Sequence, residues 1–376
     1  MAFTLTFLGK GGTGRSTLAI AAAKSFAAAG KRVLLFSYTT GPELALLLDC
    51  DLSPSVDPQS IDTNLEVVQP SKVALLERGW AEVKALEAKY LRSPFFKDIY
   101  GEELAAFPGI DRAIALNSLR KFDDSGKYDV IVYDGTGDED ELRMLGVPDV
   151  LSWYVRRFSK VVAESDFARA LNPFIQPVAG AVLNSGWGSE PWKEPMDEVD
   201  GLLAQGRDAV SNPQRLAAWL VTTPDAIAIA QAKYLWGAAQ QSSVTVGGVL
   251  VNRIADGIAD NNAIAAMSET LSETFAPLTV TGIPESSGDW SALVGAMPSF
   301  DSAGSVPRPI EIDVAQKQVR LFLPGFSKSQ VKLIQSGPEI TIEAGGQRRN
   351  ILLPAALSGR SVTGAKFQGG FLIISF

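Results

Sequence analysis

The first informative absence from this sequence is histidine, which does not occur in any of its 376 residues. Cysteine occurs once, at Cys50, so the chain cannot form an internal disulfide. Without histidine and with one thiol, a zinc site of the usual kind and a Ser-His catalytic site are both excluded. Any metal would have oxygen ligands, which Mg²⁺ prefers.

Long apolar runs are also missing. No stretch approaches the roughly 18 apolar residues that span a membrane, and a glycine-rich segment begins at residue 9, where a secretory signal would continue its apolar region. We therefore expect a cytoplasmic protein. The net charge of −8 argues against a general nucleic-acid or anionic-membrane surface, so no nucleic-acid partner is expected.

What the chain does contain is the glycine-rich motif GKGGTGRST, placed between an apolar run (residues 3–8) and a helix-forming stretch (residues 18–29). A strand, a glycine loop and a helix in this order bind phosphate, because the glycines let backbone N–H groups surround the anion at the positive end of the helix. The motif predicts ATP or ADP binding by Gly9, Lys10, Gly11, Gly12, Thr13, Gly14, Arg15, Ser16 and Thr17.

Further apolar runs predict an α/β fold. Nearly continuous apolar strands separated by helical stretches are typical of a parallel sheet covered on both faces. We predict one such domain over residues 1–300. Its expected strands, besides the first, are residues 32–37, 128–134, 217–221 and 246–251.

Two segments between these strands, residues 70–122 and 148–215, have apolar residues at helical spacing and predict an inserted helical subdomain. Core packing explains any one of the large apolar residues there. Their number also allows a groove that binds a hydrophobic client. The residues concerned are Trp80, Phe95, Phe96, Trp153, Phe158, Phe167 and Phe174.

Asp134 closes the apolar run of residues 128–134. Nucleotide hydrolases place at such a strand end the carboxylate that holds Mg²⁺ or its waters, and Ser16 would supply a hydroxyl to the same ion. The acidic, glycine-containing segment that follows, residues 135–141, is either a mobile switch loop near the metal or a solvated loop.

The last part of the chain is a different module. Residues 301–308 are rich in small residues and proline, as linkers are. From Arg308 onward the chain has 9 basic and 4 acidic residues, although its total charge is negative. Residues 309–376 alternate in short apolar runs and predict a small all-β domain.

Several segments together resemble the ArsA/Get family, the arsenite-pump-type and tail-anchored-protein-targeting ATPases. Besides the loop, these are FPGID at residues 107–111, Asp134 followed by LRML at 142–145, VLVNR at 249–253 and Pro284-Glu285. The resemblance implies a deviant P-loop ATPase core. It further implies a homodimer in which Lys10 reaches the partner's nucleotide, and an adenine site at Asn252, Arg253 and Pro284.

The resemblance implies four catalytic positions, which are Lys10, Arg15, Thr39 and Asp134. At two of them the chain departs from the family pattern. Arg15 stands where a P-loop has lysine, and Thr39 stands where the family has the aspartate that positions the attacking water. Because positioning water and neutralising phosphate charge are most of this catalysis, we expect slow hydrolysis. Asp138 or Glu139 is a candidate to position the water instead.

The cysteine count restricts the functions that this resemblance implies. An arsenite site of three cysteines cannot form, so an arsenite pump subunit is not expected. The zinc-bridged dimer of the eukaryotic targeting factor needs a Cys-x-x-Cys pair, so a dimer of this chain would form without zinc.

The β module resembles the α-crystallin domain of small heat-shock proteins, in segments such as LPGF at 323–326 and ITIEA at 340–344. This implies an immunoglobulin-like sandwich. Its sheet edges would mediate assembly or client contact, or the domain would be a passive appendage that stabilises the dimer.

Three functions follow. The first is an ATP-dependent homodimeric chaperone or targeting factor that shields hydrophobic segments, such as tail-anchored membrane protein helices, and meets membranes only through these clients. The alternative is a catalytically degenerate module in which nucleotide is structural and the β domain is a holdase. A partitioning-type ATPase acting on DNA or membranes is disfavoured by the acidic core.

Overall fold

The computed structural model describes residues 1–39, 41–90, 110–164, 193–254, 269–286 and 289–376. Its largest feature is an eight-stranded sheet in the order β3-β4-β2-β5-β1-β6-β7-β8, in which only the β3–β4 pairing is antiparallel. The strands are β1 (Phe3–Leu8), β2 (Val33–Ser37), β3 (Gln59–Asp62), β4 (Leu65–Val68), β5 (Val130–Asp134), β6 (Leu216–Thr222), β7 (Thr245–Ile254) and β8 (Thr279–Pro284).

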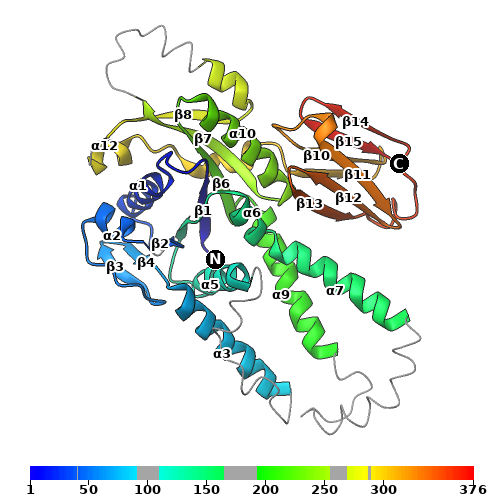
Figure 1. The fold of residues 1–376 in the computed structure, drawn as a ribbon, viewed down its shortest axis with the longest axis horizontal. Coiled ribbons are helices and arrows are strands. Elements are labelled where there is room, and N and C mark those ends of the chain that lie inside the picture. Colours follow the sequence, from blue (N-terminus) through cyan, green and yellow to red (C-terminus); the bar gives the residue numbers. More distant parts are fainter. Residues whose placement is uncertain (40, 91–109, 165–192, 255–268, 287–288) are drawn as a thin grey trace.

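Helices cover both faces of this sheet (Figure 1). One apolar cluster joins the sheet to α5, α6 and α10; the other joins it to α1, α2 and α12. The predicted α/β fold is therefore confirmed. The helices are α1 (Arg15–Ala28), α2 (Glu43–Leu48), α3 (Lys72–Tyr90), α5 (Ile110–Asp124), α6 (Glu139–Leu145), α7 (Val147–Glu164), α9 (Lys193–Ser211), α10 (Ala226–Gln241) and α12 (Trp290–Gly295).

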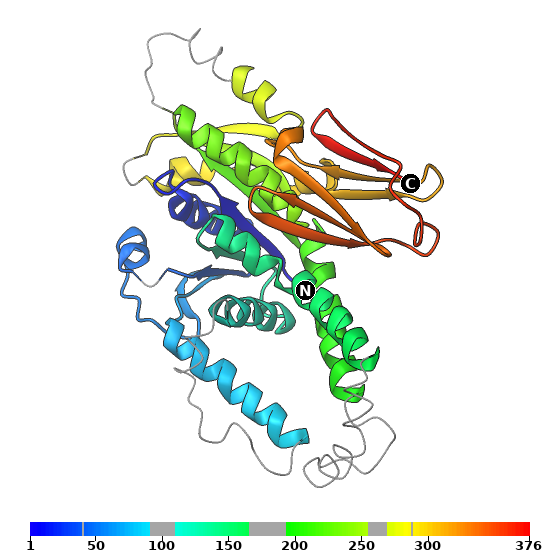
Figure 2. The same ribbon diagram turned by 45° about the vertical axis from the view of Figure 1, so that its right-hand side comes forward.

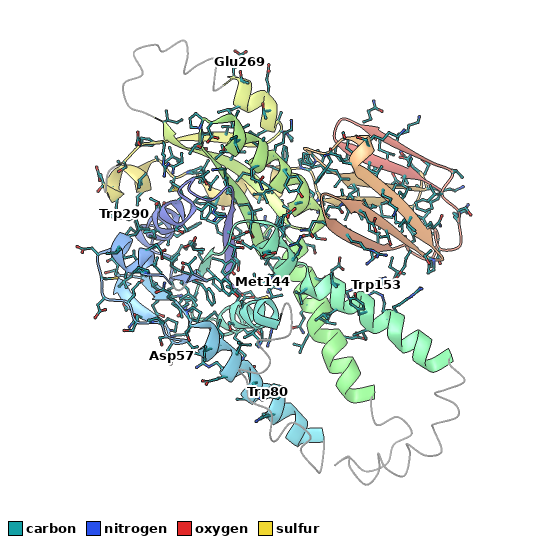
Figure 3. The ribbon with its side chains drawn as sticks, in the orientation of Figure 1. Asp57, Trp80, Met144, Trp153, Glu269 and Trp290 are labelled. Atoms are coloured by element: carbon teal, nitrogen blue, oxygen red, sulfur yellow. The ribbon has the colours of Figure 1, made fainter. Side chains whose placement is uncertain are left out.

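Helix α3 and the α7–α9 pair extend away from the sheet, as Figures 1 and 2 both show. They lie in the segments expected to be helical. Trp80 is buried and Trp153 is half-buried. Phe95, Phe96, Phe167, Phe174 and most of the FPGID segment lie outside the described residues, as does the side chain of Phe158. Among the described helices, none is both long and apolar enough to cross a membrane.

The C-terminal residues form the expected all-β domain, two antiparallel sheets packed face to face around their own apolar core. One sheet has the order β14-β15-β10-β9 and the other β11-β12-β13. The strands are β9 (Ile310–Asp313), β10 (Gln318–Phe322), β11 (Val331–Ser336), β12 (Glu339–Ala344), β13 (Gln347–Leu352), β14 (Gly364–Gln368) and β15 (Phe371–Ser375).

The segment between the two parts is packed against the sheet. Residues Phe300–Ser305 form a 3₁₀ helix whose Phe300 and Ala303 are buried in the apolar cluster beneath α1. The Ser302 hydroxyl donates to the Gly247 carbonyl at 3.0 Å. The first half of the expected linker is thus folded onto the core, and where the domains divide stays a prediction.

The β domain lies against helix α10. The Trp236 ring meets Phe322 edge-on at 5.4 Å between centroids, and Tyr234 meets Phe326 in the same way at 5.5 Å. Gly237 of α10 takes part in the same contact, because a Cβ there would overlap the Pro324 carbonyl oxygen and the Phe326 ring. Close packing at this position therefore requires glycine.

Adding one methyl group at this contact tests its importance. Gly237→Ala should lower the free energy of unfolding by about 1–3 kcal/mol, because a backbone carbonyl cannot move aside as a flexible side chain can. The matched control is Gly201→Ala in α9, where the added Cβ meets open space and should stabilise the helix by about 0.5–1 kcal/mol. Thermal unfolding of both variants measures this; equal midpoints would contradict it.

Candidate functional site

The glycine loop lies where the carboxyl ends of the parallel strands meet. It follows β1, whose neighbours β5 and β6 end beside it, and it enters α1 through Gly14 at φ 94°, a conformation that favours glycine. A Cβ on Gly9 would overlap the Val221 carbonyl oxygen, and one on Gly14 would overlap the Asn252 amide. The glycines are therefore needed for close approach to β6 and β7.

The loop residues differ in exposure. Lys10, Gly11 and Gly12 are exposed, whereas Thr13 is buried and its hydroxyl donates to the Lys10 carbonyl at 2.8 Å. Thr17 lies in the first turn of α1 and is half-buried. Residues 10–12 of the motif are thus open to solvent and the rest of it is anchored.

Asn252, expected at the adenine, supports the loop itself. Its side-chain Nδ2 donates to the Thr13 carbonyl at 2.8 Å. Arg253 is exposed and has φ 59°, and Pro284 lies at the neighbouring strand end, where Ile254 pairs with it. All three lie at the same edge of the sheet as the loop; contact with adenine remains a prediction.

Asp134 lies at the end of β5 among hydroxyl groups. The Ser16 hydroxyl donates to its Oδ1 at 3.1 Å and the Ser37 hydroxyl to its Oδ2 at 3.3 Å. Burial raises the pKa of this carboxyl, and Ser16, Arg15 and Ser37 partly oppose the shift. One carboxylate and one hydroxyl at this spacing fit Mg²⁺, which keeps several of its waters and also binds nucleotide phosphates.

Thr39 follows β2, next to this carboxylate. Its hydroxyl lies 3.0 Å from that of Ser37, and the side chain of Gln69 donates to the carbonyls of Thr39 and Gly41, both at 2.8 Å. The loop backbone is therefore held from β4. At the position where the resemblance calls for a carboxylate, the chain presents a neutral, exposed hydroxyl.

Arg15 forms hydrogen bonds within the protein. Its Nη1 donates to the Gly9 carbonyl at 2.8 Å and also to the Thr136 carbonyl. Gly9 N–H in turn donates to the Gly137 carbonyl at 2.9 Å, and Gly137 leaves no room for a Cβ beside the guanidinium. Arg15 thus ties the phosphate loop to the segment after Asp134.

Glu141 is buried beneath this tie and was not predicted. It accepts a hydrogen bond from Gly137 N–H at 2.7 Å and is also bonded to the Thr6 hydroxyl. Burial raises its pKa to about 7, against the opposing bonds of Thr6 and Gly137. The Thr6 hydroxyl also lies 3.0 Å from the Tyr133 carbonyl. Because the Thr6 hydroxyl has one hydrogen, it can donate fully to only one of these two acceptors at a time.

Neither candidate for positioning water is free of other contacts. Asp138 caps α6, accepting from Asp140 N–H at 2.9 Å, and also accepts from the Thr136 hydroxyl at 2.7 Å. Glu139 accepts from the Tyr234 hydroxyl, which lies 2.6 Å from the Gly345 carbonyl of the β domain. Glu139 is therefore part of the contact between the two parts of the protein.

Sequence reasoning missed Glu141, Gln69 and the internal role of Arg15. A signal for Glu141 was available in Thr6, a hydroxyl at the centre of a buried strand that needs a partner. Gln69 directly follows β4 (Leu65–Val68), a strand that was not predicted, and the direction of Arg15 depends on contacts distant in sequence.

Comparison with known proteins agrees with this geometry. The family model described as anion-transporting ATPase matches residues 3–284, and that of the HSP20-like domain found in ArsA matches residues 315–376. A Mycobacterium tuberculosis protein is 26% identical over 98% of this chain and 94% of its own. A Prosthecochloris vibrioformis protein, provisionally named arsenical pump-driving ATPase, is 23% identical over 99% and 95%. An ATPase ASNA1 homolog of Cryptosporidium parvum is 21% identical over 65% and 63%.

The protonation of Glu141 predicts a pH effect on stability. Its pKa in the folded protein, about 7, lies above the ordinary 4.5, so the folded state holds a proton that the unfolded chain releases. Stability should therefore fall as the pH rises through this window. Glu141→Gln, which mimics the protonated side chain, should gain about 2–3 kcal/mol relative to the wild type between pH 5 and pH 8.

Urea unfolding of both proteins at a series of pH values measures the difference. A difference that stays constant from pH 5 to pH 8 would show that Glu141 does not titrate in this range.

Proposed function

The chain belongs to the anion-transporting ATPase family, and from this membership and the geometry of the loop we propose that it is an ATP-binding homodimeric chaperone or targeting factor. It would hydrolyse ATP slowly and shield hydrophobic segments, such as the helices of tail-anchored membrane proteins. The observation that carries the proposal is a contact at the end of the anchored glycine loop. There the Ser16 hydroxyl lies 3.1 Å from Asp134 Oδ1.

In the proposed reaction, backbone N–H groups of residues 11–17 bind the nucleotide phosphates, and Ser16 and Asp134 hold Mg²⁺. A bound Mg²⁺ would neutralise phosphate charge and offset the cost of burying Asp134. Lys10 is exposed and would reach the nucleotide of a second subunit. Hydrolysis would be slow because Thr39 has no carboxylate to orient water and Arg15 is bonded to carbonyls instead.

The proposed client surface lies on α7 and α9. Val150, Leu151 and Tyr154 recur at helical spacing on α7 and are each 44–45% exposed. Leu202 on α9 is 42% exposed, and α7 and α9 pack against each other. Apolar side chains grouped on a protruding helix pair fit an apolar helix as the client. The ArsA/Get resemblance implies this class of client, and relatives named ATPase ASNA1 homolog are among the proteins that match this chain.

The alternative function, in which nucleotide is structural and the β domain binds clients, also has a specific observation in its favour. Strand β9 is an edge strand with Ile312 exposed to 40%, and an open edge strand can pair with an extended segment of another protein. Arsenite transport is not part of the proposal, because the chain has a single thiol.

Restoring a carboxylate at position 39 tests the account of slow hydrolysis. Thr39→Asp should raise kcat for Mg²⁺-dependent ATP hydrolysis at least about tenfold, a barrier reduction of ~1.4 kcal/mol, since it returns the group that orients water. Thr39→Asn is the control, because asparagine has the size of aspartate without its charge, and it should have no such effect. Asp134→Ala should abolish turnover in both backgrounds.

If Thr39→Asp and Thr39→Asn hydrolyse ATP equally, the slow step lies elsewhere. If the wild type shows no turnover above Asp134→Ala while ATP still binds, nucleotide is a structural ligand and the alternative function holds.

Client binding distinguishes the two functions directly. Leu151→Glu combined with Leu202→Glu should weaken binding of a labelled apolar transmembrane-helix peptide at least about tenfold, because charge replaces apolar contact. Ile312→Glu, a single change of the same kind at the β9 edge, should leave the affinity unchanged. Fluorescence anisotropy with ATP present measures both, and the opposite pattern would assign client binding to the β domain.

A further inference from the structure

A second cavity lies at the junction of the ATPase part and the β domain, on the side of the sheet where α6, α7 and α9 approach β13. Its volume is about 320 Å³, at the lower end of the range for small-molecule sites. Its walls come from α7, α9, the end of α10, and strands β9 and β13. It is separate from the glycine loop, none of whose residues lines it.

The charges that line this cavity are mainly positive. Arg156, Arg207 and Arg349 face one carboxylate, Asp149. Arg156 has contacts elsewhere, among them a hydrogen bond to the Ser152 hydroxyl at 3.0 Å. Ser211, Ser242 and Ser243 add hydroxyl groups to the same wall. Arginine forks and hydroxyls are the groups that proteins use to bind phosphate oxygens.

Arg349 is the costliest of these residues to place there. It is 7% exposed, and burial lowers its pKa to about 10, a shift that Asp149 partly opposes. Its Nη1 donates to the Gln240 carbonyl at the end of α10, at 2.8 Å. Neither Arg349 nor Arg207 forms an ion pair within the described residues. A buried guanidinium without a counter-ion is destabilising unless an anion joins it.

We propose that this cavity binds a small phosphate dianion, free or as the phosphate of a small monoester, between Arg349 of the β domain and Arg207 of α9. A phosphate monoester carries about −1.5 to −2 charges near pH 7, opposite in sign to the charges of Arg207 and Arg349. The ligand would form the close ion pair that Arg349 lacks among the described residues, and it would join the two parts of the protein. The inference does not depend on the nucleotide site or on client binding.

The test is calorimetric titration of the full-length protein with inorganic phosphate and, separately, with glycerol 3-phosphate. Mg²⁺-ADP at saturation occupies the glycine loop in every sample, and chloride keeps the ionic strength constant. The variant Arg207→Gln removes one cavity arginine that is only half-buried. The matched control is Arg157→Gln, which removes an exposed arginine of α7 that does not line the cavity.

We expect both wild type and Arg157→Gln to bind phosphate with affinities equal within about twofold, and Arg207→Gln to bind about tenfold more weakly, as loss of one charge-assisted hydrogen bond implies. Phosphate should also raise the unfolding temperature of the first two proteins and not of the third. Tighter binding of glycerol 3-phosphate would identify a monoester as the ligand, and equal or weaker binding would identify free phosphate.

Equal phosphate affinities in all three proteins, or no binding with Mg²⁺-ADP present, would overturn the proposal. Arg349 would then serve only to cap α10. Arg349→Met is a second variant: it should abolish phosphate binding if the proposal is right, and its circular dichroism spectrum reports whether it folds.

Discussion

The proposed nucleotide site depends on how closely the glycine loop approaches the ends of β6 and β7. Gly9 lies against the Val221 carbonyl and Gly14 against Asn252, with no room for a side chain at either contact. Parallel pairing of β1 with β6 and of β6 with β7 brings these strand ends together. The same pairing of β1 with β5 brings Asp134 to Ser16. Sheet order thus assembles the site, and the glycines permit it.

The segment after Asp134 is held from several sides. Arg15 binds it from the loop, Glu141 binds Gly137 from below, and α6 then begins at Glu139, whose carboxylate is bonded to Tyr234. Tyr234 lies within hydrogen-bonding distance of the β domain. Helix α6, seven residues long, therefore begins beside the segment that Arg15 ties to the glycine loop. Its first residue also takes part in the contact between the domains. If the segment after Asp134 moved and shifted α6, the β domain would have to move with it or the contact through Tyr234 would break.

Much of this could be predicted from sequence, because parallel strands are continuous apolar runs and the glycine loop is a local motif. The eight-stranded sheet also contains β3 and β4, four residues each, and β8, which includes Gly282 and Pro284; short or interrupted runs of this kind carry little signal. The site residues that were missed act across long sequence separations. Gln69 binds a loop 28–30 residues away, and Arg15 binds a carbonyl 121 residues away. Periodicity reports neither contact.

The replacement of lysine by arginine at position 15 has a consequence beyond the loss of one phosphate contact. A lysine is a compact, flexible charge, whereas a guanidinium donates in a fixed fork, and here that fork is used by two backbone carbonyls. The positive charge remains near the proposed phosphate site, but the Nη1 group is directed at the carbonyls of Gly9 and Thr136. In the proposed site, phosphate binding would rely on backbone N–H groups and on cations that lie outside the loop's own hydrogen bonds. Lys10, exposed at the surface of the loop, is such a cation, and this gives the proposed dimer a chemical reason: each site would receive from its partner a flexible cation of the kind that Arg15, tied to two carbonyls, does not supply.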